Sequence, residues 1–186
     1  MLIAAATPAL RDGRLRLEIV GDGPERPRLE ALAAREGIGG ALRFAGRVPP
    51  DQVHARYAAS DLLLFPSVRE FGGGVVLEAM SMGVVPLVVD AGGPGELVVA
   101  GTGLKVPLLE RQALVARLRG RIEDVLAAPA SLTALADGAR RRVETLFTWR
   151  RKAEQLGEVF DWVSGARPGK PEFGFLPRGQ AKAQRP

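Results

Sequence analysis

The sequence of 186 residues contains no cysteine, only one histidine and no long apolar run. The lack of cysteine excludes disulfide bonds, thiol catalysis and thiolate metal sites, and it fits a reducing cytosol. A helix that spans a bilayer needs about 20 predominantly apolar residues in succession, which the sequence does not offer. Residues 1–6 are too short and lack the basic leader of a signal peptide. We therefore expect a cytoplasmic protein.

Aromatic residues are also scarce, at 5%, although the net charge is +5. Most of this charge lies beyond residue 164, where five basic residues face one acidic residue and the body is left almost neutral. A neutral body with few aromatics offers neither the basic surface nor the stacking platforms of a nucleic-acid-binding protein. The single histidine, His54, lies on a mixed polar and apolar helical segment away from any acidic cluster. We expect no nucleic-acid partner and no metal site.

The order of apolar runs along the chain predicts a parallel sheet with flanking helices. Short apolar runs bounded by turn residues predict buried strands at residues 15–20, 42–45, 61–65, 86–89 and 104–106. Helical patterns cover residues 24–36, 51–59, 74–82, 110–126, 131–147 and 148–163, with Asp51 and Ser131 as expected N-caps. Strands that alternate with helices indicate a doubly wound α/β domain over residues 1–164. Residues 165–186 are rich in Gly, Pro and basic residues, which predicts a disordered basic tail.

The segment from Glu70 to Glu78 carries the chemistry that stands out most. Glu70 follows a predicted buried strand, at the sheet edge where open α/β sheets bind ligands. Glycines 72–74 then allow close approach of the backbone, and free N–H groups at the start of the next helix attract an anion. Glu78 lies about one turn further on, where it can accept hydrogen bonds from a pair of hydroxyls. One segment therefore offers a cradle for a diphosphate and two acceptors for sugar hydroxyls.

This segment resembles the E-x7-E motif of the large family of retaining GT-B glycosyltransferases that includes sucrose, glycogen and mannosyl transferases. Other stretches resemble that family in the same order, and they are residues 17–24, 44–48, 58–67, 78–83, 92–98 and 147–149. The resemblance implies a Rossmann-like domain that forms the C-terminal, donor-binding half of a GT-B fold. It implies transfer of a sugar, with retention, from a UDP-, GDP- or ADP-linked donor to a glycan or lipid acceptor, as in polysaccharide or glycolipid biosynthesis. It also implies that catalysis needs neither a metal nor another cofactor.

The resemblance also assigns roles to residues of the sequence. Glu70 would contact the transferred sugar as the catalytic residue, and Glu78 would bind the ribose hydroxyls. The other donor-binding residues that it implies are Phe71, Gly72, Gly73, Gly74, Val75, Arg47, Val48 and Gly21. The loop with Gly92 and Gly93 is expected to be mainly structural.

The match begins at a helix that follows the first strand in the family. We therefore expect this domain to lack its first, central strand, which leaves the strands at residues 15–20 and 61–65 with unpaired edges. The family's N-terminal domain, or another partner chain, would complete the enzyme. The basic pair that stabilises the leaving phosphate lies on a loop after that strand, so we expect little transfer by the chain alone.

Three other interpretations stay open at this level. The chain could be a non-catalytic nucleotide-sugar-binding module or the remnant of a split gene, which would share every motif. A sugar-nucleotide epimerase has the same architecture but not the E-x7-E frame. A third is peripheral contact with anionic lipid at the inner membrane surface, through the basic residues Arg140, Arg141, Arg142, Arg150, Arg151 and Lys152.

Overall fold

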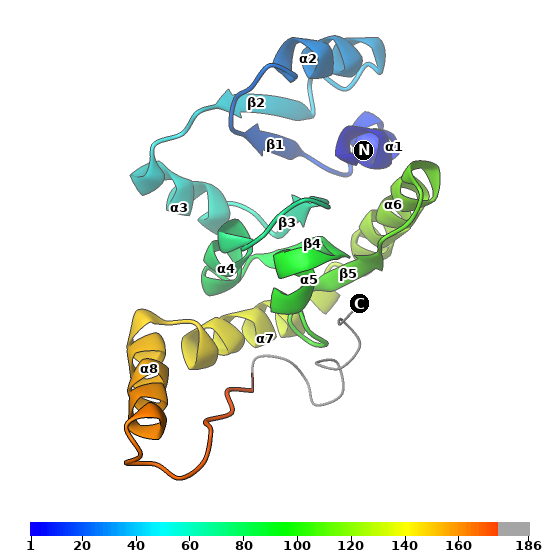
Figure 1. The fold of residues 1–186 in the computed structure, drawn as a ribbon. Helices are drawn as coiled ribbons and strands as arrows, with labels where there is room; N and C mark the ends of the chain where they lie inside the picture. Colours follow the sequence, from blue (N-terminus) through cyan, green and yellow to red (C-terminus); the bar gives the residue numbers. More distant parts are fainter. Residues whose placement is uncertain (175–186) are drawn as a thin grey trace.

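The computed structural model describes residues 1–174 and shows parallel strands flanked by helices, as the sequence predicts (Figure 1). The helices are α1 (Leu2–Arg11), α2 (Arg26–Arg35), α3 (Pro50–Ala58), α4 (Gly74–Ser81), α5 (Gly92–Leu97), α6 (Arg111–Ala127), α7 (Ser131–Leu146) and α8 (Trp149–Val163). The strands are β1 (Leu17–Val20), β2 (Leu42–Gly46), β3 (Leu62–Phe65), β4 (Val85–Asp90) and β5 (Leu104–Pro107). Every predicted strand is therefore confirmed, with small changes at its ends.

The strands form two parallel sheets instead of one. In the first sheet β1 pairs with β2, and Leu17 lies opposite Leu42. In the second sheet β4 lies between β3 and β5, with Leu64 opposite Leu87. Within residues 1–174, neither the outer edge of β1 nor that of β3 has a strand partner. The prediction that these two edges are unpaired is confirmed.

Helices cover the second sheet on both faces and hold the two sheets together. On one face, α1 and α6 share a hydrophobic cluster with residues from both sheets, among them Leu42 of β2 and Val89 of β4. On the other face, Val76 and Met80 of α4 and Ala139 of α7 pack against Val88. The middle strand β4 is therefore buried from Val85 to Val89, as a central parallel strand requires.

Three local predictions were wrong at helix starts and loops. Asp51 is not an N-cap, because α3 begins one residue earlier at Pro50, whose ring presets the helical φ at this position. Ser131 is not a cap either, because its N–H already bonds to Ala128 O at 3.0 Å in the turn that leads into α7. Residues 92–97, expected to be a loop, form the short helix α5 after β4.

The predicted tail is described only in its first part. Arg167 pairs with Glu158 of α8 through Nη1 and Oε2 at 2.6 Å, and its N–H bonds to Asp161 O at 2.9 Å. Residues 175–186 lie outside the described part of the chain, so disorder there remains a prediction.

Candidate functional site

Glu70 lies at the carboxyl end of β3, in the loop that leads into α4. Its Oε1 accepts hydrogen bonds from the N–H groups of Gly72, at 3.2 Å, and Gly73, at 3.0 Å. Gly73 is the N-cap of α4 and adopts a left-handed conformation with φ of 64°. This conformation suits glycine and turns both N–H groups toward one carboxylate oxygen. The start of α4 therefore already holds a negative charge, as helix N-termini favour.

The loop after β4 supports the Glu70 loop by close backbone contact. The N–H of Gly93 bonds to Glu70 O at 3.4 Å. A Cβ at Gly92 would come within 2.7 Å of Glu70 O, and a Cβ at Gly93 would overlap Phe71 O. Both glycines are therefore needed because backbone packs directly on backbone. This geometry gives Gly92 and Gly93 the structural role that the sequence predicts.

The loop after β4 and helix α5 are held by basic side chains of β5 and α7. Lys105 Nζ of β5 donates to Asp90 Oδ1 at 2.8 Å and to Gly95 O at 3.2 Å. Arg142 of α7 donates from Nε to Leu97 O at 2.9 Å, at the carboxyl end of α5. These contacts fix the ends of α5, and through it the loop on which the Glu70 backbone rests.

Glu78 has a neighbour that sequence reasoning missed. Tyr57, on α3, lies with its hydroxyl 3.3 Å from Glu78 Oε2 and 3.4 Å from Val75 O, so its single proton is shared between them. Burial, followed by the nearby Glu78 carboxylate, raises the pKa of Tyr57 to about 12. No motif spacing reveals this pair, because the two side chains come from different helices. The only hint of a special role in the sequence is that Tyr57 is its single tyrosine.

The remaining predicted residues lie on the other sheet. Gly21 follows β1 and Gly46 ends β2, and the N–H of Gly21 bonds to Gly46 O at 2.7 Å. Arg47 is exposed and Val48 is half-buried just beyond this contact. In residues 1–174, no hydrogen bond or ion pair joins this group to the Glu70 loop. The structure therefore brings the predicted residues together in two groups, one at the carboxyl edge of each sheet.

The Glu70 loop is open to solvent. The Phe71 side chain is fully exposed, and Val75 and Glu78 are also exposed on the first turns of α4.

Among the described residues, no group of three or more His, Cys, Asp or Glu side chains could hold a metal ion. Likewise, no helix of residues 1–174 has the length and apolar character to cross a bilayer.

Residues 1–142 match the family described as "Glycosyl transferases group 1". The chain belongs to this family. It is 34% identical over 168 residues to a D-inositol 3-phosphate glycosyltransferase of Rhodococcus opacus (strain B4), which covers 86% of this chain and 36% of that protein. The chain spans roughly a third of the length of the curated relatives that it matches.

Solved structures share the fold, among them a domain of a group 1 glycosyl transferase. The C-terminal domain of LpcC from Francisella tularensis superposes with a TM-score of 0.69 at 20% identity, over 80% of this chain and 78% of that domain. Anabaena HepE in complex with UDP-glucose gives a TM-score of 0.67 at 25% identity, over 84% of this chain and 44% of HepE. The chain therefore has the α/β, Rossmann-like fold of the C-terminal domain of GT-B glycosyltransferases.

Proposed function

We propose that this chain forms the nucleotide-sugar site of a retaining glycosyltransferase, which transfers a sugar from a UDP-, GDP- or ADP-linked donor to a glycan or lipid acceptor without a metal or other cofactor. The observation that carries the proposal is the arrangement of two carboxylates around one helix start. Glu70 is fixed in front of α4, and Glu78 lies one turn inside it.

The hydrogen bonds of Glu70 give it a defined orientation. Its Oε1 is held by two backbone N–H groups, whereas its Oε2 has no hydrogen-bond partner in residues 1–174. An oxygen that is positioned but free can accept a hydrogen bond from a sugar hydroxyl. We therefore assign Glu70 to the transferred sugar, with its orientation set before the donor arrives.

The start of α4 can then hold the diphosphate. The first N–H groups of a helix, here at Gly74 and Val75, have no acceptor within the helix and point toward an anion. When the bond between the sugar's anomeric carbon and the diphosphate oxygen breaks, the bonding electrons stay on the diphosphate as negative charge, and N–H groups already in place stabilise it. Glu78 accepts from the two ribose hydroxyls, for which Tyr57 keeps its carboxylate in position.

What binds to related proteins supports this assignment. The HepE structure, with the same fold, is a complex with UDP-glucose. The Rhodococcus relative is named as a glycosyltransferase acting on D-inositol 3-phosphate. The first description favours a donor of the nucleotide-sugar class, and the second favours glycosyl transfer; the inositol acceptor of the relative is not carried over to this chain.

Calorimetric titration with UDP, GDP, ADP and the corresponding glucose conjugates tests the donor site. We expect one base to bind in preference to the others. Glu78→Ala removes hydrogen bonds to a charged group, each worth about 1.5–3 kcal/mol, so it should weaken nucleotide binding about 10- to 100-fold. Glu144→Ala, at an exposed position on α7, is the matched control and should leave binding unchanged. Equal binding by wild type and Glu78→Ala would contradict the site.

Transfer is tested separately from binding. We expect the purified chain to bind the nucleotide sugar but to transfer sugar poorly. The loss of one preorganised hydrogen-bond donor to the leaving group typically costs about 10²–10³ in rate. Robust transfer by this chain alone would refute that expectation. If the partner domain of a related enzyme also fails to restore transfer to a chain that binds donor, the non-catalytic binding module becomes the better description.

A further inference from the structure

The N–H of Gly73, which holds the Glu70 carboxylate, lies in close contact with α5. Gly73 is buried, and a Cβ added there would lie 3.2 Å from Pro94 Cγ and 3.3 Å from Leu97 Cδ1. These two α5 side chains therefore pack directly on the backbone of Gly73. Closely packed groups pass a displacement on to their neighbours. A shift of α5 would thus move the donor of the 3.0 Å hydrogen bond to Glu70 Oε1.

Helix α5 contacts the Glu70 loop at both of its ends. At its start, the backbone of Gly92 packs on Glu70 O. At its end, the Leu97 side chain packs on Gly73. Because α5 has only six residues, and because the C=O groups at the end of a helix lack partners within it, α5 needs contacts from other elements to keep its place. The position of α5 therefore depends on the groups that hold its ends.

Arg142 of α7 holds the carboxyl end of α5, which lies beside α7 in Figure 1. Its Nε donates to Leu97 O at 2.9 Å, across 45 positions in the sequence. The guanidinium also lies over the Phe147 ring, with Cζ 5.4 Å from the ring centre, a distance at which the ring attracts a cation. Burial lowers the pKa of the Arg142 guanidinium, since it is partly withdrawn from water. Arg142 is therefore a fixed contact between α7 and α5.

Apolar packing fixes α7 itself relative to the site. Ala139 of α7 and Val76 of α4 are fully buried in one cluster. Val143 of α7 and Leu97 of α5 pack against the same cluster. The segment of α7 that carries Arg142 is therefore anchored on α4, and it provides a firm base from which the arginine reaches α5.

The other carboxylate of the site is supported by a different element. Glu78 receives its hydrogen bond from Tyr57 of α3. A change at the end of α5 should therefore act first on Glu70, and on the part of a ligand that Glu70 contacts.

We propose that Arg142 is a positioning residue of the donor site, which sets the orientation of the Glu70 carboxylate toward the transferred sugar. It acts through Leu97 and Gly73, which lie between the two side chains. The role toward the sugar rests on the proposed function, whereas the effect on the hydrogen bond between Gly73 and Glu70 can be measured without any ligand.

Arg142→Met tests this role. Methionine reaches as far along the side chain as Nε but has neither the N–H nor the charge. Arg141→Met is the matched control, because Arg141 is the exposed neighbour on α7 and its side chain makes no hydrogen bond or ion pair within residues 1–174. The two variants therefore lose the same charge, but only Arg142→Met loses the contact with Leu97.

NMR of the full chain without ligand gives the first readout. In wild type, the amide proton of Gly73 should shift when acid protonates its acceptor, the Glu70 carboxylate, and Glu70→Gln should abolish this shift. We expect Arg142→Met to lose most of the shift and Arg141→Met to keep it. Because the shift is a property of the folded chain, a change in overall stability does not mimic its loss.

Calorimetric titration gives the second readout, with the nucleoside diphosphate that binds wild type and with its glucose conjugate. We expect Arg142→Met to weaken binding of the conjugate about fivefold relative to the nucleotide alone, the size of one lost hydrogen bond. In a Glu70→Ala background, Arg142→Met should have no further effect, because the group that it positions is gone. Arg141→Met should leave both affinities unchanged.

The two readouts separate the possible failures. A Gly73 shift that persists in Arg142→Met would overturn the positioning of Glu70. Equal weakening of nucleotide and conjugate, or an additive effect in the Glu70→Ala background, would overturn the role toward the sugar. If wild type binds no nucleotide, the proposed function fails, and loss of the Gly73 shift in Arg142→Met would still support the positioning of the carboxylate.

Discussion

Tyr57 offers a direct test of the geometry around Glu78, because its ionisation can be followed in isolation. The pKa of its phenol is raised to about 12, first by burial and then by the Glu78 carboxylate. Since the ordinary value is about 10, the folded chain retains this proton at pH values where the unfolded chain has lost it. Stability from this group is therefore fully present below pH 10 and is lost as the pH rises from about 10 to about 12.

The size of the effect follows from the same shift. Two pKa units correspond to about 2.7 kcal/mol between the protonation states. Tyr57 is only half-buried, so solvent screening reduces the contribution to the free energy of unfolding to roughly 1 kcal/mol. We expect wild type to lose about this much stability across the window. Tyr57→Phe has no group to ionise and should lack this part of the loss.

The assay is a spectrophotometric pH titration of the phenolate, with circular dichroism to show that the chain stays folded. Because the sequence has one tyrosine, the signal needs no assignment. Glu78→Gln removes the charge but keeps the burial, so the midpoint should fall while remaining above 10. Glu144→Gln should leave it unchanged. A wild-type midpoint near 10, or one that does not respond to Glu78→Gln, would refute the proximity of the two groups.

Two further predictions concern the supporting loop and the surface. Gly93→Ala should destabilise the chain by about 2 kcal/mol or more in denaturant unfolding, because the new Cβ overlaps Phe71 O. The control Gly120→Ala in α6 places a Cβ with nothing within 4 Å and should be neutral or stabilising. Equal effects of the two substitutions would contradict the close packing at Gly93. Helix α8 carries exposed apolar residues, with Trp149 91% exposed, and the basic residues Arg150, Arg151 and Lys152. We therefore expect sedimentation with vesicles to depend on anionic lipid, and binding that ignores lipid charge would rule out attraction to anionic lipid.

Much of the fold could be predicted because strands and helices leave local patterns. The runs at residues 61–65 and 86–89 are short, apolar and bounded by turn residues, which favours buried strands, and β3 and β4 lie there. Helix starts were less predictable. Ser131 has the chemistry of a cap, but the preceding turn at Pro129 had already begun the helix, so local hydrogen bonding overrode residue type.

The Glu70 segment is the part of the candidate site that could be predicted from the sequence. Its carboxylates, glycines and helix start are close in the chain, so their arrangement at the end of β3 followed from local spacing. The groups that support them are distant in sequence. Tyr57 reaches Glu78 from α3, and Lys105 reaches Asp90 from β5, contacts that arise only when separate elements pack together.

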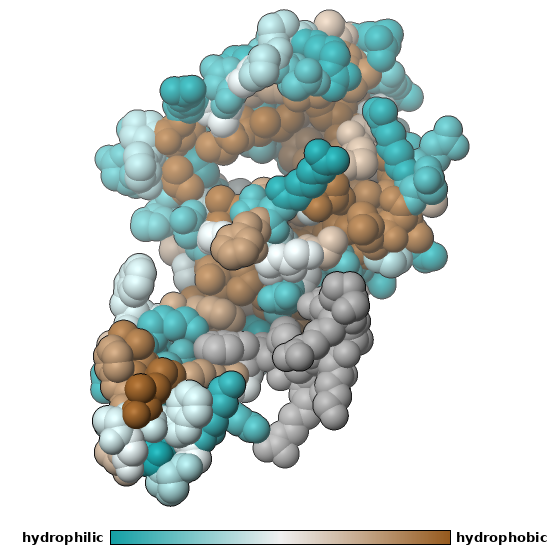
Figure 2. Space-filling model, in the orientation of Figure 1, coloured by the Kyte–Doolittle hydropathy of each residue, from teal (hydrophilic) through white to brown (hydrophobic). Residues whose placement is uncertain are grey.

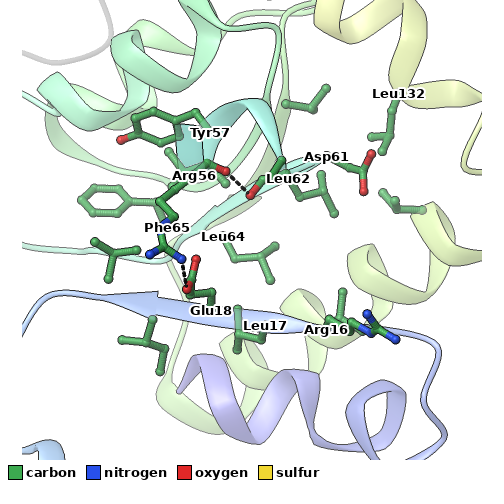
Figure 3. A pocket seen from close by; sticks show the side chains of 18 of the residues that line it. Arg16, Leu17, Glu18, Arg56, Tyr57, Asp61, Leu62, Leu64, Phe65 and Leu132 are labelled. Atoms are coloured by element: carbon green, nitrogen blue, oxygen red, sulfur yellow. Dashed lines mark hydrogen bonds and ion pairs between the residues drawn. The ribbon is translucent and has the colours of Figure 1, made fainter. Parts of the chain in front are cut away.

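The sequence by itself determined the parallel α/β class and the helix start between Glu70 and Glu78, because each depends on a local pattern. The unpaired edges of β1 and β3 were expected from the resemblance to the family. Only the tertiary structure decided that the sheets stay apart around a cavity lined by β1 and β3, seen as an apolar hollow in Figure 2. Whether two unpaired edges close up depends on the helices that hold them, and here α1, α6 and the Glu18–Arg56 pair (Figure 3) fix both walls across the open space.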